Sequence, residues 1–197
     1  MPYRIMQPSF YTESELAQLG LKAYGEDVLI SRYARLYSPE HISIGSHVRI
    51  DDFCILSGHI TLGSHIHISA YCALYGAMGI TLHDYTGISA QSVVYSAVDD
   101  FSGEHLIGPM SPKGTTDVQG GEVVLERFVQ IGAQCMLFPN IYMAEGSVLG
   151  AKSMLKFTPP YYSQQTYWKS ESWTIYAGIP ARPIKSREKG LLKYIIT

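Results

Sequence analysis

Two pairs of histidines share one spacing in the sequence: His41 with His59, and His47 with His65, are each 18 residues apart. In a chain that repeats with this period, each pair would stack at one corner of successive repeats. Corner side chains point outward in such a chain, so a solvated polar corner is the simplest interpretation. A zinc site, the chemical alternative, would require several histidines to converge on one point.

His105 lies outside this spacing, in a segment rich in Gly, Asp and Glu. Because an imidazole titrates near neutral pH, it is suited to take a proton from an attacking hydroxyl or amine. We therefore identify His105 as the candidate general base, with Asp99 or Asp100 orienting either the imidazole or the acceptor. The alternative is that residues 102–105 form only a polar loop tip.

The segment 44–73, which precedes Asp99, Asp100 and His105 in the chain, repeats with a period of six. A branched apolar residue opens each hexad, and a small or apolar residue follows four positions later. The openers are Ile44, Ile50, Leu56, Leu62 and Ile68, and the second set is Val48, Cys54, Ile60, Ile66 and Cys72. A helix would need apolar spacings of three and four, and a plain strand would alternate. The period therefore predicts an all-β solenoid, a parallel β-helix whose short strands stack coil on coil.

The same period covers most of the chain, from Ile30 to Leu155, and predicts roughly six coils of three strands. Two extra residues interrupt it near Pro39 and again at 76–79. We expect an N-terminal helical cap over 1–27, the β-helix over 28–158 and a C-terminal extension over 159–197. The period is lost over 95–123, where the composition is that of a loop, and long loops inside compact domains are usually functional.

Thr12 and Glu15 have the spacing of a capping box, which predicts a short helix over 13–20 that packs on one end of the solenoid. The three cysteines occupy inward small positions of the repeat, and we expect Cys54, Cys72 and Cys135 to pack in the core. An odd number of cysteines is also more typical of a reducing compartment.

Composition argues against several classes of function. The net charge is −2 and no basic run is present, so nucleic-acid binding has little electrostatic support. No apolar run approaches the roughly 18 residues of a membrane span, and the N-terminus lacks the apolar core of a signal peptide. We therefore expect a cytoplasmic protein without a membrane span.

The segments IGAQCMLFPNIYMAEGSVLGAKSML (131–155) and AGIPARPIK (177–185) resemble the hexapeptide-repeat acyltransferases, the left-handed parallel β-helix family of maltose, galactoside and serine acetyltransferases. The second segment is similar to that family's A-G-x-P-A-[KR]-x-I-[KR] tail. FYTESELAQLG (10–20), RIDDFCILSG (49–58) and YSAVDDFSGEH (95–105) look most like a subgroup found with surface-polysaccharide biosynthesis, lipopolysaccharide included.

This resemblance implies an acetyl-CoA-dependent O- or N-acetyltransferase acting on a nucleotide-sugar or another sugar of polysaccharide biosynthesis. It also implies left-handed winding and a homotrimer that binds acetyl-CoA, or occasionally another acyl-CoA, between subunits. The residues it places beside the pantetheine arm are Gly132, Ala133, Gly150, Ala151 and Lys152. Those it places on the CoA phosphates are Lys152, Arg182 and Lys185. Ordinary surface charge is the alternative for these three basic residues.

In many relatives the general base is a His in an S-H-D or T-H-P motif where the loop leaves the coil, whereas this sequence has Asp99 there. Either Asp99 acts as the base, which requires burial to raise its pKa, or His105 folds back to do so. An amine acceptor would make a strong base unnecessary.

Two other classes of function remain open from the sequence. A γ-class carbonic anhydrase shares the β-helix and the trimer but needs zinc; His59, His65 and His67 are its nearest candidates, and their spacings differ from that family's. We accordingly expect no metal site. A non-catalytic β-helix scaffold is the third possibility. The sequence leaves open which sugar is acylated, at which position, and on oxygen or nitrogen.

Overall fold

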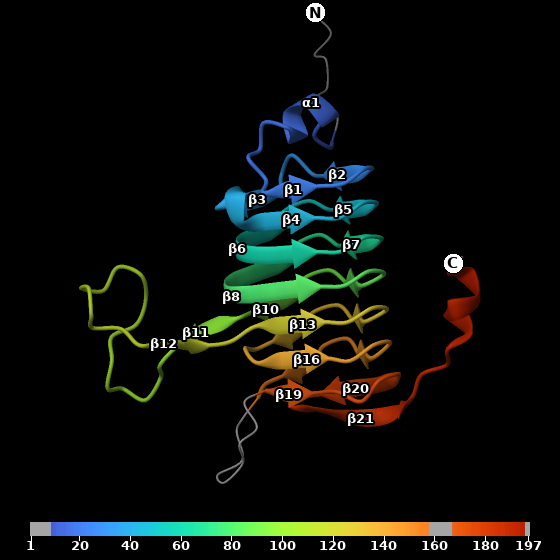
Figure 1. The fold of residues 1–197 in the computed structure, drawn as a ribbon. Helices are drawn as coiled ribbons and strands as arrows, with labels where there is room; N and C mark the ends of the chain where they lie inside the picture. Colours follow the sequence, from blue (N-terminus) through green and yellow to red (C-terminus); the bar gives the residue numbers. More distant parts are fainter. Residues whose placement is uncertain (1–8, 158–166, 196–197) are drawn as a thin grey trace, which may run out of the picture.

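The computed structural model describes residues 9–157 and 167–195, which form a rod of about seven stacked turns (Figure 1). The strands of the rod form one sheet of 8 strands and one of 11 strands that bends around a corner, and a separate sheet of two strands lies outside the rod. Each turn is therefore triangular in section, and we call its faces A, B and C in the order A, B, C along each turn. The predicted all-β solenoid is confirmed.

Each face is a ladder of parallel strands in consecutive turns. Face A contains β3 (Arg35–Tyr37), the first half of β6 (Ile55–Leu62) and of β8 (Ala73–Leu82), β10 (Val93–Tyr95), β15 (Met136–Leu137) and β18 (Met154–Leu155). Face B contains β1 (Ala23–Tyr24), β4 (Ile42–Ile44), the second halves of β6 and β8, β13 (Val123–Leu125), β16 (Ile141–Met143) and β19 (Trp168–Lys169).

Face C contains β2 (Val28–Ile30), β5 (Val48–Ile50), β7 (Ile66–Ile68), β9 (Gly87–Ile88), β14 (Gln130–Ile131), β17 (Val148–Leu149) and β20 (Thr174–Gly178). A final strand, β21 (Ala181–Ser186), turns back and pairs antiparallel with β20. It thereby covers part of an edge that would otherwise offer open backbone groups for pairing.

The hexad openers form continuous apolar columns inside the rod. On face C, for example, the register stacks one buried residue per turn, in the order Ile50, Ile68, Ile88, Ile131 and Leu149. One turn cannot bury its openers alone, because their apolar surface is covered only by the turns above and below. This mutual coverage explains why the period of six predicts the fold so directly.

The corners between faces are tight, and their middle residues take a left-handed backbone conformation. Phe53 (φ 60°), Tyr71 (φ 61°) and Lys152 (φ 56°) are examples on one edge of the prism. We call this the CA edge, because it joins face C to face A through residues 51–54, 69–72, 89–92, 132–135 and 150–153. The AB edge and the BC edge join the other faces.

Both two-residue insertions are confirmed. The first forms the 3₁₀ turn η1 (Pro39–His41). The second is absorbed within β8, where the pairing of Gly58 with Gly76 is followed by that of Ile60 with Ile80. Gly79 takes φ 100° there, which costs glycine little strain. Insertions at an edge leave the columns of openers in register.

The N-terminal helix α1 (Glu13–Leu16) is shorter than the predicted 13–20, because the N–H groups of Gln18 and Leu19 bond to carbonyls three residues back and tighten the chain. Glu15 accepts a hydrogen bond from the Thr12 N–H at 2.8 Å, as expected of a capping box. None of the helices within the described residues is long and apolar enough to cross a membrane.

Parallel pairing extends beyond the predicted 28–158 at both ends, since β1 pairs with β4, and β19 and β20 pair with β16 and β17. These strands bring the number of turns above the predicted six. Of the C-terminal extension predicted over 159–197, residues 159–166 and 196–197 lie outside the described residues, and η2 (Gly190–Tyr194) is its last described element. The first eight residues of the predicted cap also lie outside them.

The 95–123 stretch leaves and rejoins the rod at the AB edge and projects from its side (Figure 1). It is not a structureless loop as its composition predicted, because β11 (Ala97–Asp99) and β12 (Val118–Gly120) pair antiparallel at its base. A bridge between Leu106 and Thr116 continues this pairing outward. We call residues 95–123 the excursion.

Candidate active site

A groove of about 750 Å³ lies where the excursion meets the AB edge. One wall comes from the base of the excursion, including Asp99 and Asp100, and the other comes from the corners that follow β15 and β18. The remaining lining residues that bear on its chemistry are Gln119, Phe138, Asn140, Lys156 and Phe157. Carboxylates, amides, an amine and aromatic rings thus converge in one place, as expected of a site for a polar organic ligand.

Asp100 and His105 are in direct contact within the excursion. The Asp100 carboxylate is joined to Nδ1 of His105 at 2.9 Å, and it accepts further hydrogen bonds from the N–H and hydroxyl of Ser102. The bonds from Ser102 and then from His105 hold the Asp100 carboxyl at a pKa of about 2. An ionised carboxylate therefore orients the imidazole, an arrangement typical of a general base.

Asp99 points differently from its neighbour. One of its carboxylate oxygens lies 3.4 Å from the backbone N–H of Gly108, and the residue lines the groove. His105 is half exposed and is not among the residues that line the groove. The structure thus brings Asp100 and His105 together, and it leaves Asp99 as the aspartate of the groove that does not contact the imidazole.

Asp117 adds a third ligand-type side chain to this cluster. Ligand atoms of Asp100, His105 and Asp117 all lie within 4.8 Å of one another, so this set could hold a metal ion. The sequence did not point to it, because Asp117 is 12 residues from His105 and approaches only through the pairing of the excursion with itself. The carbonyl of Asp117 accepts the N–H of Asp100 at 2.9 Å.

The predicted cofactor residues lie on the CA edge. Gly132, Ala133, Gly150, Ala151 and Lys152 occupy equivalent corners of two successive turns, and the N–H of Lys152 bonds to the carbonyl of Ala133 at 2.8 Å. Their side chains are small apart from the exposed Lys152, so the backbone of this edge is open to close approach.

The glycines on this edge are also required by the stacking of turns. A Cβ on Gly132 would lie 2.4 Å from the backbone nitrogen of Ala151 in the next turn. A Cβ on Gly150 would lie 3.2 Å from the Cβ of Ala177. The sequence interpretation attributed these two glycines only to the close approach of a cofactor. The structure shows that the packing of successive turns also excludes a side chain at Gly132 and leaves little room for one at Gly150.

The other two basic candidates lie on β21. Arg182 is paired with Ala177 and Lys185 with Ile175, and both side chains are exposed. Ala177 lies on the CA edge one turn beyond Gly150 and Lys152. Because Arg182 pairs with Ala177, Lys152 and Arg182 lie at the same end of the rod. An anionic group bound along the last turns would meet these cations.

Within one chain the predicted catalytic and cofactor residues do not meet. The catalytic residues lie at the AB edge and the small-residue corners of the cofactor set lie on the CA edge. These two edges are at opposite ends of the face A strands β10, β15 and β18. The sequence reading did not anticipate this separation. The AB-edge residues Phe138, Asn140 and Lys156 were also missed, although each follows a predicted strand and so could have been assigned to a corner.

The histidine pairs stack at the corners as predicted. The rings of His41 and His59 have centroids 4.4 Å apart, and those of His47 and His65 are 4.7 Å apart. His67 instead contacts Asp51 through Nε2 at 2.8 Å on face C. The three histidines considered for zinc therefore lie on different parts of the coil surface and do not converge within the chain.

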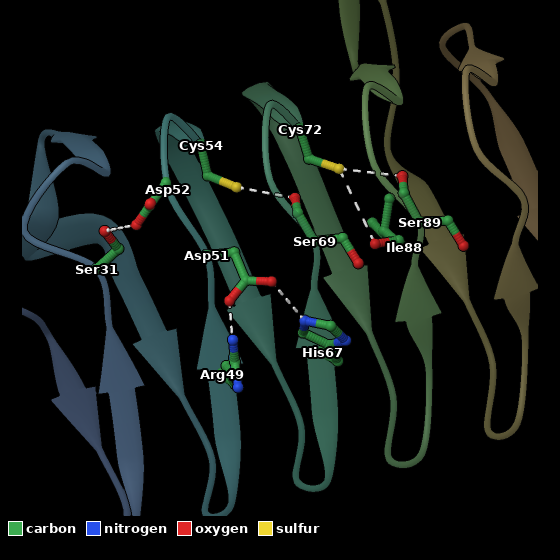
Figure 2. A network of polar contacts seen from close by, with 10 residues as sticks. All are labelled: Ser31, Arg49, Asp51, Asp52, Cys54, His67, Ser69, Cys72, Ile88 and Ser89. Atoms are coloured by element: carbon green, nitrogen blue, oxygen red, sulfur yellow. Dashed lines mark hydrogen bonds and ion pairs between the residues drawn. The ribbon is translucent and has the colours of Figure 1, made fainter. Parts of the chain in front are cut away.

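The cysteines are buried, as predicted, and each thiol also donates to a corner carbonyl of the next turn. Cys54 donates to Ser69 at 3.1 Å and Cys72 to Ser89 at 3.2 Å (Figure 2). Cys135 donates in the same way to Gly150 at 3.0 Å. Burial raises the pKa of the Cys135 thiol, although backbone hydrogen bonds oppose the shift. These contacts indicate a structural role on the CA edge.

No protein-family model matches the chain. The dTDP-4-amino-4,6-dideoxy-D-glucose acyltransferase of Escherichia coli is 35% identical over 188 residues, covering 94% of this chain and 92% of that relative. AntD, an N-acyltransferase from Bacillus cereus, is 44% identical, and the structure of an aspartate-to-alanine variant of it with dTDP and coenzyme A gives a TM-score of 0.86, covering 95% of this chain and 96% of AntD.

A hexapeptide-repeat acetyltransferase from Vibrio cholerae, 18% identical, covers 90% of this chain and 82% of its own, with a TM-score of 0.52, and so shares the fold alone. The two similar relatives above are acyltransferases, neither zinc hydratases nor scaffolds, so both alternative readings of the sequence are wrong. The chain belongs to the hexapeptide-repeat sugar acyltransferases, enzymes with a left-handed β-helix that transfer an acyl group from a coenzyme A thioester to a sugar.

Proposed function

We propose that this enzyme acylates the amino group of a dTDP-linked 4-amino-4,6-dideoxyhexose. The observation that carries the proposal is the 44% identity to AntD, which was crystallised with dTDP-4-amino-4,6-dideoxyglucose and coenzyme A. The relative from Escherichia coli is named for the same sugar. The proposal therefore selects nitrogen over oxygen as the acylated atom, a choice that the sequence left open.

The donor in this proposal is acetyl-CoA, as the family resemblance implied. AntD was also crystallised with 3-hydroxybutyryl-CoA, which makes this larger thioester the alternative donor. The small side chains of Gly132, Ala133, Gly150 and Ala151 support a pantetheine arm along the CA edge, and Lys152, Arg182 and Lys185 supply positive charge for the phosphates.

The proposed chemistry is the attack of the sugar amine on the thioester carbonyl. A carbon–nitrogen bond forms, the carbon–sulfur bond breaks, and the amine loses a proton that ends on the CoA sulfur. His105 is proposed to take that proton, Asp100 to orient the imidazole, and Asp99 to position the amine in the groove. The 2.9 Å contact between Asp100 and His105 supports this division of roles.

A comparison with AntD supports the role of Asp99. Its solved structures include variants in which one serine or one aspartate is replaced, and these two positions are ten residues apart. Ser89 and Asp99 are the only serine and aspartate in this sequence with that order and separation. Ser89 lies on the CA edge, with the predicted cofactor residues, and Asp99 lies at the AB edge, with the predicted catalytic residues. The pair therefore includes one residue from each of these two sets.

We propose a homotrimer in which the excursion of one subunit meets the CA edge of its neighbour. The separation of the two residue sets within one chain supports this, because catalysis requires the thioester and the base at one point. We further propose that the enzyme works in the cytoplasm, for which the three unpaired buried cysteines are the supporting observation.

The test is a thiol-release assay on the purified protein with acetyl-CoA and 3-hydroxybutyryl-CoA as donors. The acceptors are dTDP-4-amino-4,6-dideoxyglucose and, as a matched control without an amine, dTDP-glucose. We expect turnover only with the amino sugar and faster turnover with acetyl-CoA. Faster transfer to dTDP-glucose would overturn N-acylation, and faster turnover with 3-hydroxybutyryl-CoA would overturn the choice of donor.

A further inference from the structure

Three aromatic rings stack on the exposed N-terminal part of the CA edge. The ring centroids of Tyr33 and Phe53 are 5.6 Å apart, and those of Phe53 and Tyr71 are 4.9 Å apart. Tyr71 is 57% exposed and Phe53 is 49% exposed. By contrast, the aromatic column on the BC edge ends in Phe128 and Trp173, which are buried. The CA-edge rings thus offer apolar surface that the described part of the chain leaves open to solvent.

A polar network lies beside these rings on face C. Asp51 accepts a hydrogen bond from Nε of Arg49 at 2.7 Å and contacts Nε2 of His67 at 2.8 Å (Figure 2). Partial burial opposes ionisation of Asp51, but the bonds from His67 and Arg49 outweigh it, so the pKa of the carboxyl is lowered.

One carboxylate therefore fixes the positions of both nitrogen-bearing side chains. Arg49 and His67 are about half exposed. No hydrogen bond to another described residue engages the Arg49 Nη atoms or the His67 Nδ1. These nitrogens are thus available to an anion at the surface.

The network continues the strip of surface proposed to bind the donor. Asp51, Ser69, Ser89, Gly132 and Gly150 are equivalent positions in five successive turns, since each follows a stacked opener of face C. With about 4.8 Å between stacked strands, Arg49 and His67 lie about one to two turns from Ser89. A donor on Gly132, Gly150 and Lys152 occupies the C-terminal side of Ser89, which leaves the N-terminal side to the acceptor.

We propose that Arg49, His67, Phe53 and Tyr71 bind the nucleoside-diphosphate part of the acceptor. The inference rests on the proposed function, because it assumes a nucleotide-linked amino sugar. Arg49 and His67 donate hydrogen bonds to the diphosphate, and Asp51 holds them in place. The base packs against the exposed side of the Phe53–Tyr71 stack, where the ring edges are open to solvent and can contact any nucleobase. Acceptor and donor then lie end to end along one edge, with the amine between them.

The experiment measures the binding of thymidine diphosphate and of coenzyme A by calorimetry, and KM for acceptor and donor, in the full-length protein. His67→Gln and Tyr71→Ala should each weaken thymidine diphosphate binding by about tenfold and raise the acceptor KM similarly, while coenzyme A affinity stays within about twofold. Tyr71→Phe should retain most of the affinity, because it keeps the ring.

Two control variants match these substitutions closely. His47→Gln removes another half-exposed histidine that contacts an aspartate, Asp27, at 3.1 Å. Tyr37→Ala removes a tyrosine that is also 57% exposed but lies on face A. Both controls should bind thymidine diphosphate like the unmodified protein.

Unchanged thymidine diphosphate binding in His67→Gln and Tyr71→Ala would overturn the inference. Dissociation of the oligomer in these variants would also overturn it, because these side chains would then hold subunits together and not bind the nucleotide. If the unmodified protein neither binds thymidine diphosphate nor acylates the dTDP-amino sugar, the proposed function itself fails. If it does both while the variants are unaffected, only the assignment of this subsite fails.

Discussion

Asp100 and His105 are joined by a 2.9 Å contact across the base of the excursion. The sequence indicated only that one of two adjacent aspartates would orient the imidazole, and the pairing of β11 with β12 selects Asp100. Both aspartates line the groove, but the Asp99 carboxylate lies 3.4 Å from the backbone nitrogen of Gly108 and does not contact the imidazole. Asp99 is the last residue of β11 and Asp100 lies just beyond it, so the two carboxylates have different partners.

His105→Gln should lower kcat by about a hundredfold without changing the donor KM, because the variant loses the proton acceptor. Asp100→Asn should have a smaller effect, since the imidazole remains but is less well oriented. Glu104→Gln, at a neighbouring exposed position, is the control. The assignment of the base is wrong if His105→Gln slows turnover less than about tenfold in steady-state thiol release.

The pH profile gives a second check on this pair. The Asp100 carboxyl has a pKa of about 2, so it stays ionised as the pH falls through the range in which the enzyme can be assayed. Any acidic limb of kcat above about pH 4 must therefore come from another group. We expect Asp100→Asn to lower kcat without removing that limb, and a limb that disappears in this variant would contradict the lowered pKa.

Asp99→Asn should raise the acceptor KM by about tenfold, because a carboxylate that positions the amine is replaced by a neutral amide. Ser89→Ala should act in the same direction if the two residues serve one site. Steady-state kinetics at saturating acyl-CoA separates this effect from donor binding. An increase in the donor KM alone would show that Asp99 acts on the acyl-CoA and not on the acceptor.

Lys152→Met and Arg182→Met should each weaken coenzyme A binding by about fivefold, since each removes a charge-assisted contact to a phosphate. The same variants should bind pantetheine, which lacks those phosphates, as the unmodified protein does. Lys113→Met, on the excursion, is a control for loss of one positive charge. Equal losses for coenzyme A and pantetheine would argue against phosphate recognition.

Gly132→Ala should destabilise the protein by about 1–3 kcal/mol, because the new methyl group would overlap the backbone of Ala151 in the next turn. Gly190→Ala is the matched control, since a Cβ there would have no heavy atom within 4 Å. Thermal unfolding followed by circular dichroism measures both. Equal melting temperatures would show that the turns can separate enough to accept a side chain.

The contact between Glu15 and Arg32, at 2.8 Å and 2.5 Å, ties α1 to the first turn of the rod. The hydrogen bond from Arg32, followed by those from Thr12, lowers the Glu15 pKa from 4.5 to about 2. A depressed carboxyl pKa stabilises the folded state above the unfolded-state value, and this stabilisation is lost as the pH falls through the folded-state value.

The unmodified protein should therefore melt at a higher temperature than Glu15→Gln at pH 6. That difference should shrink as the pH falls from about 4.5 to about 2. Thermal unfolding of both proteins across this range is the measurement. A difference that stays constant with pH would show that Glu15 acts through packing and not through its charge.

The openers from Ile44 to Leu155 determined the solenoid without any tertiary information. A period of six can bury its apolar residues only by stacking turns, so local pattern and global fold coincide. The positions of the corners followed as well, since they lie between the predicted strands. The family resemblance then led to acyl transfer and to the small-residue corners at Gly132 and Gly150.

What the sequence could not give was the relation between segments that the period does not govern. Asp117 approaches His105, and Asp99 separates from Asp100, only because the excursion pairs with itself. The network of Arg49, Asp51 and His67 arises because turns 18 residues apart lie side by side. Such contacts depend on register and on the direction of each side chain, and these properties belong to the assembled coil and not to the spacing of residues along the chain.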